Sequence, residues 1–316
     1  MRLHTGSPRC LYHPRVATAV IDIGTNTLLL LIVDPQLRPL VDACRFGRLG
    51  QGLDASGQLS EEAIARSLEI CREYRALIHE HRAGPPTIVA TQALREAANS
   101  AAFTVPAEDI LGAPIEVITG AREAELAFTA VTRTFPELAG TPYVVVDVGG
   151  GSTELITTDG TRVVSAVSLP IGAVRLTERH LVSDPPKPAE VRALVAEIDA
   201  QLATLDLPRE VTVVGTAGTA TTIAAIAKGL IRHDPDKVTG VRVSPMAVDA
   251  QLARMLTQTV AQRRATRGIE PQRADVIAGG VAIYARILHR IDAPTMITCD
   301  RGIRWGLAYE RATRNA

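Results

Sequence analysis

A glycine-rich turn carries groups suited to binding a phosphate. It lies in the segment VVVDVGGGSTELI, where Asp147 and Glu154 flank it. Glycine lets the backbone approach a ligand closely with its N–H groups aimed at an anion, and carboxylates are oxygen ligands that Mg²⁺ prefers. We expect this turn to bind a phosphate, together with a metal ion held by Asp147 and Glu154. A hairpin turn without a ligand accounts equally well for the glycines. The predicted phosphate-binding residues of this turn are Gly149, Gly150, Gly151, Ser152 and Thr153.

The beginning of the chain repeats the same pattern. The segment VIDIGTNTLLLLI, which starts at Val20, also has an apolar stretch ending in Asp, then Gly, a small-hydroxyl turn and a second apolar stretch. Two such units far apart in one chain indicate duplication and a cleft between two similar domains. In that arrangement Thr25 and Asn26 form the facing wall of the phosphate site, and Asp22 is a third metal-binding carboxylate.

A third turn of small residues, GTAGT, stands between a predicted strand and a predicted helix. A helix that begins there has unpaired N–H groups and a positive partial charge, which suit an anion. Close packing of small residues at a helix cap is an equally good explanation. No GK[ST] follows, so the turn is not a Walker A loop. The phosphate-binding residues expected here are Gly215, Thr216, Gly218 and Thr219.

Predicted strands and helices alternate along the chain and must position these turns. The alternation favours an α/β fold, as in the helix expected from LSEEAIARSLEICREYRALIHEH, with Ser60 as its cap. We expect two domains after a flexible leader over residues 1–16. The first spans residues 17–132 and is completed by a C-terminal helix at about 301–316, and the second spans residues 133–300.

Composition narrows the classes of function. Lys+Arg and Asp+Glu number 34 each, and aromatic residues are 3% of the 316, so neither a non-specific polyanion binder nor a base-stacking nucleic-acid binder is expected. The apolar run from Thr27 to Val33 is too short to cross a bilayer. The four cysteines form no CxxC pair and are typical of reduced thiols, which predicts a cytoplasmic protein without a membrane segment.

Single charged residues are harder to interpret. Glu123 and Glu125 stand at the start of a predicted helix, where glutamates usually serve only as partners of the helix dipole. Arg95, near a strand–helix junction, is either a surface charge or a guanidinium that binds a phosphate group through two N–H donors. Other cations expected near the cleft are Arg175, Arg273 and Arg301.

Taken together, these motifs resemble the exopolyphosphatase/guanosine pentaphosphate phosphohydrolase (Ppx/GppA) family of the actin-like ATPase superfamily. The resemblance implies duplicated actin-like, ribonuclease H-like α/β domains with a cleft between them. It covers nearly the whole chain, and its matching segments, in order, are IDIGTNT, LSEEAI, ATQALREAAN, EVITGAREAELAF, VVVDVGGGSTELI, SLPIGAVRLTE, GTAGT, DPDKVTG, RADVIAGG and DRGIRWG.

The resemblance also implies roles for particular residues. Glu123 in GAREAE matches the glutamate that activates the attacking water, and Asp147 and Glu154 match the carboxylates that hold Mg²⁺ (or Mn²⁺). Asn26, Arg95 and the turn from Gly149 to Thr153 match the phosphate-binding shell. The implied reaction is in-line attack of water on a terminal phosphorus. The resemblance also implies that the chain forms a homodimer.

The chain departs from the family pattern at several positions. Arg122 takes the place of the first carboxylate in GxEEA, which leaves Glu125 as a second candidate base. Trp305, His233 and Thr239 replace residue types common in the family, and we expect these changes to affect substrate selection. The chain ends just after the second expected domain, so short family members are the better comparison and processive action on long polymers is not expected.

The leading function is hydrolysis of terminal phosphates from inorganic polyphosphate of short to medium chain length. The alternative is removal of the 5′-phosphate of pppGpp. Two further alternatives belong to other classes: an ATP-dependent actin-like kinase, because fold alone does not fix function, and a catalytically weak phosphate or alarmone sensor.

Overall fold

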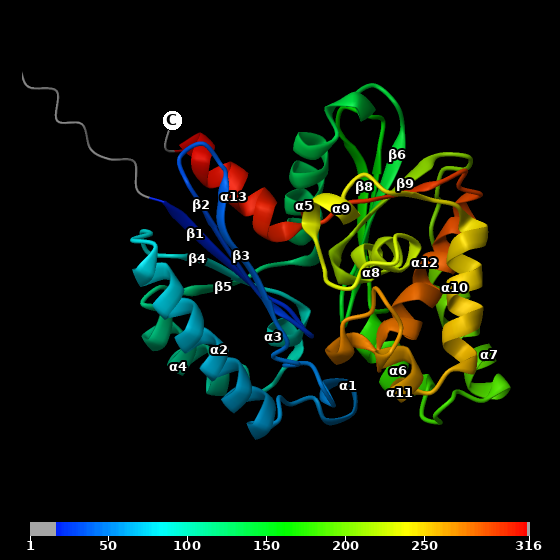
Figure 1. Ribbon diagram of the computed structural model, residues 1–316, viewed down its shortest axis with the longest axis horizontal. Helices are drawn as coiled ribbons and strands as arrows, with labels where there is room; N and C mark the ends of the chain where they lie inside the picture. The colour runs from blue at the N-terminus through cyan, green and yellow to red at the C-terminus, as the bar shows by residue number, and fades with distance from the viewer. Residues whose placement is uncertain (1–16, 315–316) are drawn as a thin grey trace, which may run out of the picture.

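Two β-sheets form the framework of the chain. The computed structural model describes residues 17–314, and the leader expected over residues 1–16 lies outside them. The first sheet has the order β3-β2-β1-β4-β5 and the second has the order β10-β11-β9-β6-β7-β8 (Figure 1). The strands of the first sheet are β1 (Thr18–Ile23), β2 (Leu28–Val33), β3 (Pro39–Arg45), β4 (Thr87–Ala90) and β5 (Ile115–Val117). Those of the second are β6 (Tyr143–Val148), β7 (Thr153–Thr158), β8 (Val163–Leu169), β9 (Thr212–Thr216), β10 (Arg242–Val243) and β11 (Met296–Thr298).

The two sheets repeat one topology. In the first, β1, β2 and β3 are antiparallel neighbours, and β4 and then β5 add to β1 in parallel. In the second, β6, β7 and β8 are antiparallel neighbours, and β9 and then β11 add to β6 in parallel. This repetition confirms the duplicated α/β architecture. It also places the β1–β2 and β6–β7 turns at equivalent positions.

Helices α2 and α4 pack together beside the first sheet. Helix α2 begins after Ser60, whose side chain accepts a hydrogen bond from the N–H of Ala63, as the sequence predicts. Its buried face includes Tyr74, whose hydroxyl donates to the carbonyl of Leu28 at 2.7 Å and so ties the helix to β2. The helices of this part are α1 (Leu53–Ser56), α2 (Glu61–Glu80), α3 (Gln92–Glu96) and α4 (Ala101–Leu111).

Two helices lie side by side between the sheets, α5 (Gly120–Thr134) and α13 (Ile303–Arg314) (Figure 1). Helix α13 contacts β1 and β2, whereas α5 contacts β6, β7 and β8. Leu126 of α5 and Trp305 of α13 share one buried apolar cluster with Val20 of β1. The C-terminal helix therefore packs on the first sheet, and α5 joins it to the second.

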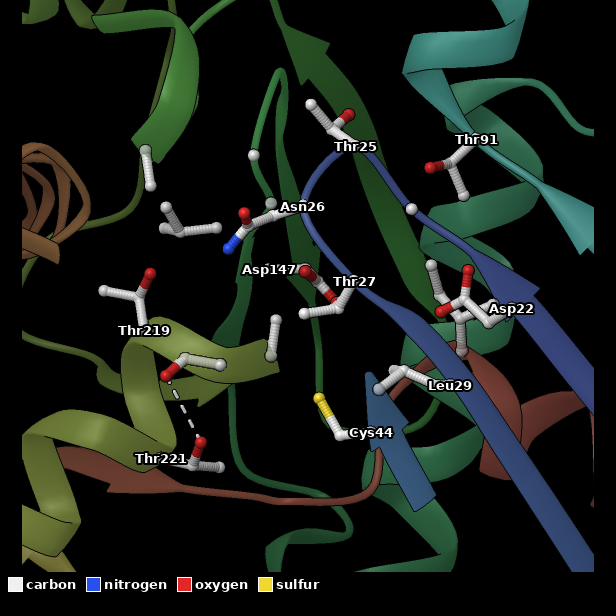
Figure 2. A pocket seen from close by; sticks show the side chains of 18 of the residues that line it. Asp22, Thr25, Asn26, Thr27, Leu29, Cys44, Thr91, Asp147, Thr219 and Thr221 are labelled. Carbon is white, nitrogen blue, oxygen red and sulfur yellow. Dashed lines mark hydrogen bonds between the residues drawn. The ribbon is translucent and has the colours of Figure 1, made fainter. Parts of the chain in front are cut away.

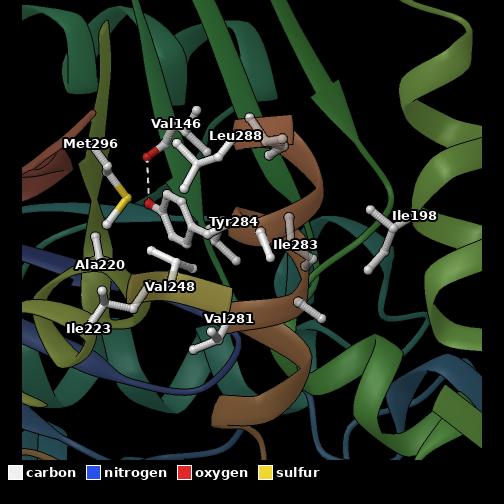
Figure 3. Close-up of a cluster of buried hydrophobic side chains, with 14 of the residues drawn as sticks. Val146, Ile198, Ala220, Ile223, Val248, Val281, Ile283, Tyr284, Leu288 and Met296 are labelled. Atoms are coloured by element: carbon white, nitrogen blue, oxygen red, sulfur yellow. Dashed lines mark hydrogen bonds between the residues drawn. The ribbon is translucent and has the colours of Figure 1, made fainter. Parts of the chain in front are cut away.

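The largest apolar core lies on the second sheet around α12 (Ile277–Ile291) (Figure 3). Tyr284 is fully buried there, and its hydroxyl lies 2.8 Å from the carbonyl oxygen of Val146 and 2.9 Å from that of Thr216. It joins β6 to β9 just below the turns that follow these strands. The remaining helices are α6 (Ala173–His180), α7 (Pro188–Ala203), α8 (Ala217–Ala227), α9 (Pro235–Val238), α10 (Pro245–Thr257) and α11 (Val260–Arg264), with 3₁₀ turns at Pro136–Leu138 and Pro271–Arg273.

No helix within residues 17–314 combines the length and apolar character that a membrane crossing requires.

Candidate active site

A cavity of about 170 Å³ opens between the parts built on the two sheets. Its walls come from the turn after β1, the turn after β6 and the beginning of α8. Figure 2 shows Asn26 from the first turn, Asp147 from the end of β6 just before the second turn, and Thr219 from α8 around the same space. The three turns that the sequence singled out therefore meet at one site.

The turns after β1 and β6 share their geometry. The N–H of Gly24 donates to the carbonyl of Thr27 at 2.9 Å, and the N–H of Gly149 donates to the carbonyl of Ser152 at 3.0 Å. The two turns also touch, because a Cβ atom added at Gly150 would lie 2.8 Å from Cβ of Thr25. Only a residue without a side chain permits this close approach.

The third segment is the beginning of α8, where Ala217, Gly218 and Thr219 line the cavity. Ala217 has a φ of 61°, in the left-handed region, and turns the chain from β9 into the helix. The hydroxyl of Thr216 does not cap the helix, because it donates instead to Oδ2 of Asp147 at 2.8 Å. Helix α8 therefore begins at the cavity, and no side chain of its N-cap residue binds its first N–H groups. Such free N–H groups are suited to binding an anion.

The carboxylates that the sequence assigned to the site all line this cavity and are almost fully buried: Asp22, Glu123, Asp147 and Glu154. Burial, with repulsion from Glu123 and Asp147, raises the pKa of Asp22 to about 7, although Arg304 opposes this. Burial also raises the pKa of Glu123 to about 7 against the effect of Arg95. Burial and the neighbouring carboxylates raise the pKa of Glu154 well above its usual value. The site holds more negative charge than its cations balance.

Each carboxylate is held differently. Oε1 of Glu154 accepts a hydrogen bond from the hydroxyl of Ser168 at 2.7 Å, and Asp147 accepts from Thr216. Burial raises the pKa of Asp147, and this hydrogen bond opposes the increase. Oδ1 of Asp22 is buried without a hydrogen-bond partner in the described part of the chain.

The donor set fits a divalent cation in a particular way. Among residues 17–314, no three His, Cys, Asp or Glu side chains are arranged to enclose a metal by themselves. Mg²⁺, however, is usually held by one or two carboxylates together with water and substrate phosphate oxygens. The unpartnered oxygen of Asp22 and the mutually repelling Asp147 and Glu154 suit such an open site.

The structure distinguishes the two candidate glutamates of α5. Glu123 lines the cavity, and the side chain of Glu125 is 63% exposed. Arg122 binds Glu125 at 3.1 Å and also Glu310 of α13, at 2.9 Å to its Oε1. The arginine that replaces a carboxylate in this motif therefore forms an ion pair with the C-terminal helix, away from the cavity.

Several residues expected to bind phosphate are not in the cavity wall. The hydroxyl of Thr153 donates to the carbonyl of Ile171 at 2.6 Å, and Gly215 packs against Tyr284. Arg95 lies beside Glu123 and binds its carboxylate. Thr216 likewise lies outside the cavity wall, and its hydroxyl is hydrogen-bonded to Asp147. These residues support the wall, whereas the wall itself includes Thr25, Asn26, Gly149, Gly150, Gly151, Ser152, Gly218 and Thr219.

Of the expected cleft cations, only Arg273 lines the cavity. Arg175 binds Glu96, and Arg301 stacks over the ring of Trp305 at 4.3 Å. Both are therefore engaged with an acidic or aromatic partner outside the cavity wall.

Sequence reasoning missed a second group of cavity residues. Arg304 of α13 binds both carboxylate oxygens of Asp42 on β3, at 2.9 and 3.1 Å, and Oδ2 of Asp300 at 2.6 Å. His233, one of the departures from the family pattern that are expected to affect substrate selection, also lines the cavity and lies 2.8 Å from Oδ1 of Asp300. Asp300 and Arg304 stand in DRGIRWG, a segment that carried the resemblance, and could have been found there. Asp42 had no comparable signal.

Comparisons with known proteins identify the family of this chain. The model of the Ppx/GppA phosphatase family matches residues 32–315. Exopolyphosphatase 2 of Mycobacterium tuberculosis is 40% identical over 289 residues, which cover 86% of this chain and 90% of that protein.

Solved structures of related proteins share the fold. An exopolyphosphatase-like protein superposes with a TM-score of 0.90 at 34% identity, covering 95% of this chain and all (100%) of the other. A Ppx/GppA family member of Aquifex aeolicus superposes with a TM-score of 0.79 at 30% identity, covering 95% and 98% of the two chains. The expected duplicated α/β fold is confirmed, and this chain belongs to the Ppx/GppA phosphatase family.

Proposed function

We propose that this chain is an exopolyphosphatase, which uses water to remove terminal phosphates from inorganic polyphosphate of short to medium length. The observation that carries the proposal is the buried carboxylate of Glu123, which is bound by Arg95 and lines a cavity together with the turns after β1 and β6 and the beginning of α8. The name of the 40%-identical relative, Exopolyphosphatase 2, supports the same substrate.

The terminal phosphate binds among the turns. Backbone N–H groups at the tip of the Gly149–Ser152 turn and at the beginning of α8 face its oxygens, and Asn26 lies opposite them. Arg273 supplies a cation in the same cavity for the following phosphates. Positioning and charge stabilisation are the main contributions that a protein makes to phosphoryl transfer.

Glu123 acts as the general base. Its carboxylate takes a proton from a water molecule while the water oxygen bonds to the terminal phosphorus and the bridging P–O bond breaks, so that the shortened chain departs as an anion. A pKa of about 7 suits a group that must take and return a proton near neutral pH. Arg95 binds Oε1 of Glu123 and so holds the carboxylate in place.

Mg²⁺ or Mn²⁺ is the proposed cofactor, with Asp22, Asp147 and Glu154 as the residues that would hold it. When bound, the ion would neutralise negative charge on the phosphate oxygens. It would also relieve the repulsion that adds to burial in raising the pKa of Asp22 and Glu154.

The test compares phosphate release in the presence of Mg²⁺ from short polyphosphate, long polyphosphate and pppGpp. We expect kcat/KM to be highest for short polyphosphate and hydrolysis of pppGpp to be slower. Faster release from pppGpp would replace the proposed substrate with the alarmone. Tight binding of all three without release from any would contradict an enzymatic function and favour a sensor.

A further inference from the structure

An ion pair links the two halves of the molecule behind the phosphate site. Arg48 lies in the loop between β3 and α1, and its guanidinium binds both oxygens of Asp275, with Nη1–Oδ2 at 2.8 Å and Nη2–Oδ1 at 3.1 Å. Nη2 also donates to the carbonyl of Gln272. The side chains of Arg48 and Asp275 are 24% and 31% exposed, so water screens the pair only in part.

On the first side, the loop of Arg48 holds the Thr25–Asn26 turn through the main chain. The N–H of Arg48 donates to the carbonyl of Asn26 at 3.0 Å, and the N–H of Gly50 donates to that of Thr25 at 2.8 Å. Arg48 adopts a φ of 53°, a left-handed conformation that a residue with a side chain rarely takes. The loop therefore cannot shift at Arg48 without disturbing the turn.

On the second side, Asp275 stands among residues that line the cavity. Arg273 lies two residues before it and Val276 directly follows it, and both line the first cavity. The guanidinium of Arg273 lies over the ring of Phe46 at 5.2 Å, which is a second contact from the same loop. Arg273 also packs against the beginning of α8, because a Cβ atom at Gly218 would lie 2.1 Å from its Nη1.

A second cavity, of about 200 Å³, lies at this junction. Arg48 and Asp275 are part of its lining, and it shares Thr25, Asn26 and Val276 with the first cavity. Oδ1 of Asn26, in the shared wall, is buried without a hydrogen-bond partner in the described part of the chain. The space behind Asn26 is therefore not filled by side chains, and the ion pair spans the two walls beside it.

We propose that Arg48 and Asp275 are positioning residues, which set the distance between the Asn26 wall and the Arg273–Val276 wall and thereby the affinity for the phosphate chain. Neither residue touches the reacting atoms, and each acts through its neighbours in the wall. The inference rests on the proposed exopolyphosphatase function for its kinetic consequence only.

The kinetic test uses Arg48→Ala, Asp275→Ala and the charge-swapped double variant Arg48→Asp/Asp275→Arg. If the ion pair keeps the two walls at the separation that binds the phosphate chain, each single variant should raise KM for short polyphosphate about fivefold. The reason is that a smaller fraction of the protein would have the walls at that separation. The change in kcat is expected to stay below about twofold, since Glu123 and its partners are untouched. The swap should restore at least half of the lost affinity.

The matched control is Arg45→Ala. Arg45 stands three residues earlier and pairs with Glu73 on α2, so its ion pair stays within one half of the molecule. Its loss should leave KM unchanged. Equal KM in wild type and Arg48→Ala, or a swapped variant as weak as the single variants, would overturn the inference.

Hydrogen exchange gives a readout that does not depend on turnover. Amides of residues 24–27 should exchange faster in Arg48→Ala than in wild type or Arg45→Ala, and the swap should slow them again. If the wild type released no phosphate from polyphosphate, the proposed function would fail while this arm still tested the ion pair. Unchanged exchange in Arg48→Ala would overturn the positioning role itself.

Discussion

Nη1 of Arg95 lies 2.7 Å from Oε1 of Glu123, and the same nitrogen lies 2.6 Å from the carbonyl oxygen of Ile118. The arginine thus joins the end of α3 to the segment leading into α5, and it fixes one oxygen of the buried carboxylate. A sequence resemblance alone gave Arg95 a place in the phosphate-binding shell. Its position indicates that its main partner is the base.

Replacing Arg95 should change the pH dependence of catalysis. Burial raises the pKa of Glu123, and the hydrogen bond and charge of Arg95 oppose that increase. In Arg95→Met the pKa of Glu123 should rise further, so less of it is ionised at pH 7. We expect the acid limb of the kcat–pH profile to move to higher pH by about one unit or more. A profile with its acid limb unmoved would contradict this account of Arg95.

Asp22→Asn should stabilise the protein when no divalent cation is present. The pKa of Asp22 is about 7 in the folded state, against a usual 3.8, so the folded state disfavours its ionised form. The resulting penalty is absent below about pH 4, grows as pH rises through 7 and is complete above it. Above pH 7 we expect the amide variant to be more stable by on the order of 3 kcal/mol.

Urea unfolding at pH 5 and pH 8, with EDTA or with Mg²⁺, measures this effect. Mg²⁺ should stabilise the wild type more than Asp22→Asn, because the ion would bind the ionised carboxylate. Equal stabilisation of both proteins by Mg²⁺ would remove Asp22 from the proposed metal site.

Arg304→Met should destabilise the fold. The guanidinium binds Asp42 and Asp300, and all three side chains are largely buried. Although burial opposes it, the charge of Arg304 and the hydrogen bond from His233 lower the pKa of Asp300 to about 2. Loss of the arginine leaves two carboxylates without their cation, which costs about 3–5 kcal/mol. Denaturant unfolding at pH 7 is the measurement, and a loss below 1 kcal/mol would be inconsistent with this network.

The stability that this network gives Asp300 should also depend on pH. Because the folded pKa of Asp300 lies below the usual 3.8, its contribution is complete above about pH 4 and is lost as pH falls towards 2. The difference in unfolding free energy between wild type and Arg304→Met should therefore shrink over that range. A difference that stayed constant from pH 6 to pH 2 would exclude Asp300 as its source.

Tyr284→Phe should reduce stability with little effect on chemistry. The hydroxyl of Tyr284 lies between the carbonyl oxygens of Val146 and Thr216, and the variant leaves both buried acceptors without it. The expected loss is about 1–3 kcal/mol in urea unfolding, with kcat at saturating substrate within about threefold of wild type. A large fall in kcat with unchanged stability would show that this contact acts on the site.

Much of the site could be predicted because strand ends and turns leave local signals. The paired Asp–Gly turns repeat in sequence, and their sheet partners place them at matching positions, as the registers Asp22–Leu29 and Asp147–Glu154 show. The family resemblance then supplied Glu123 as the base, which α5 brings to the cavity wall.

The rest depends on long-range packing that no local pattern encodes. Asp42 reaches the cavity because β3 lies at the edge of the first sheet and α13 returns to that sheet from the far end of the chain. Thr153 belongs to a phosphate-binding pattern, yet its hydroxyl is committed to Ile171, eighteen residues further on. Sequence spacing does not reveal which donors the fold has already used.

The most direct test of the central claim is phosphate release from short polyphosphate by Glu123→Gln, with Glu125→Gln as its matched control on the same helix. Loss of a general base should lower kcat by about 10²–10⁴-fold in Glu123→Gln while the substrate still binds, and Glu125→Gln should keep kcat near that of wild type. Full activity in Glu123→Gln, or loss of activity only in Glu125→Gln, would contradict the assignment of Glu123 as the base.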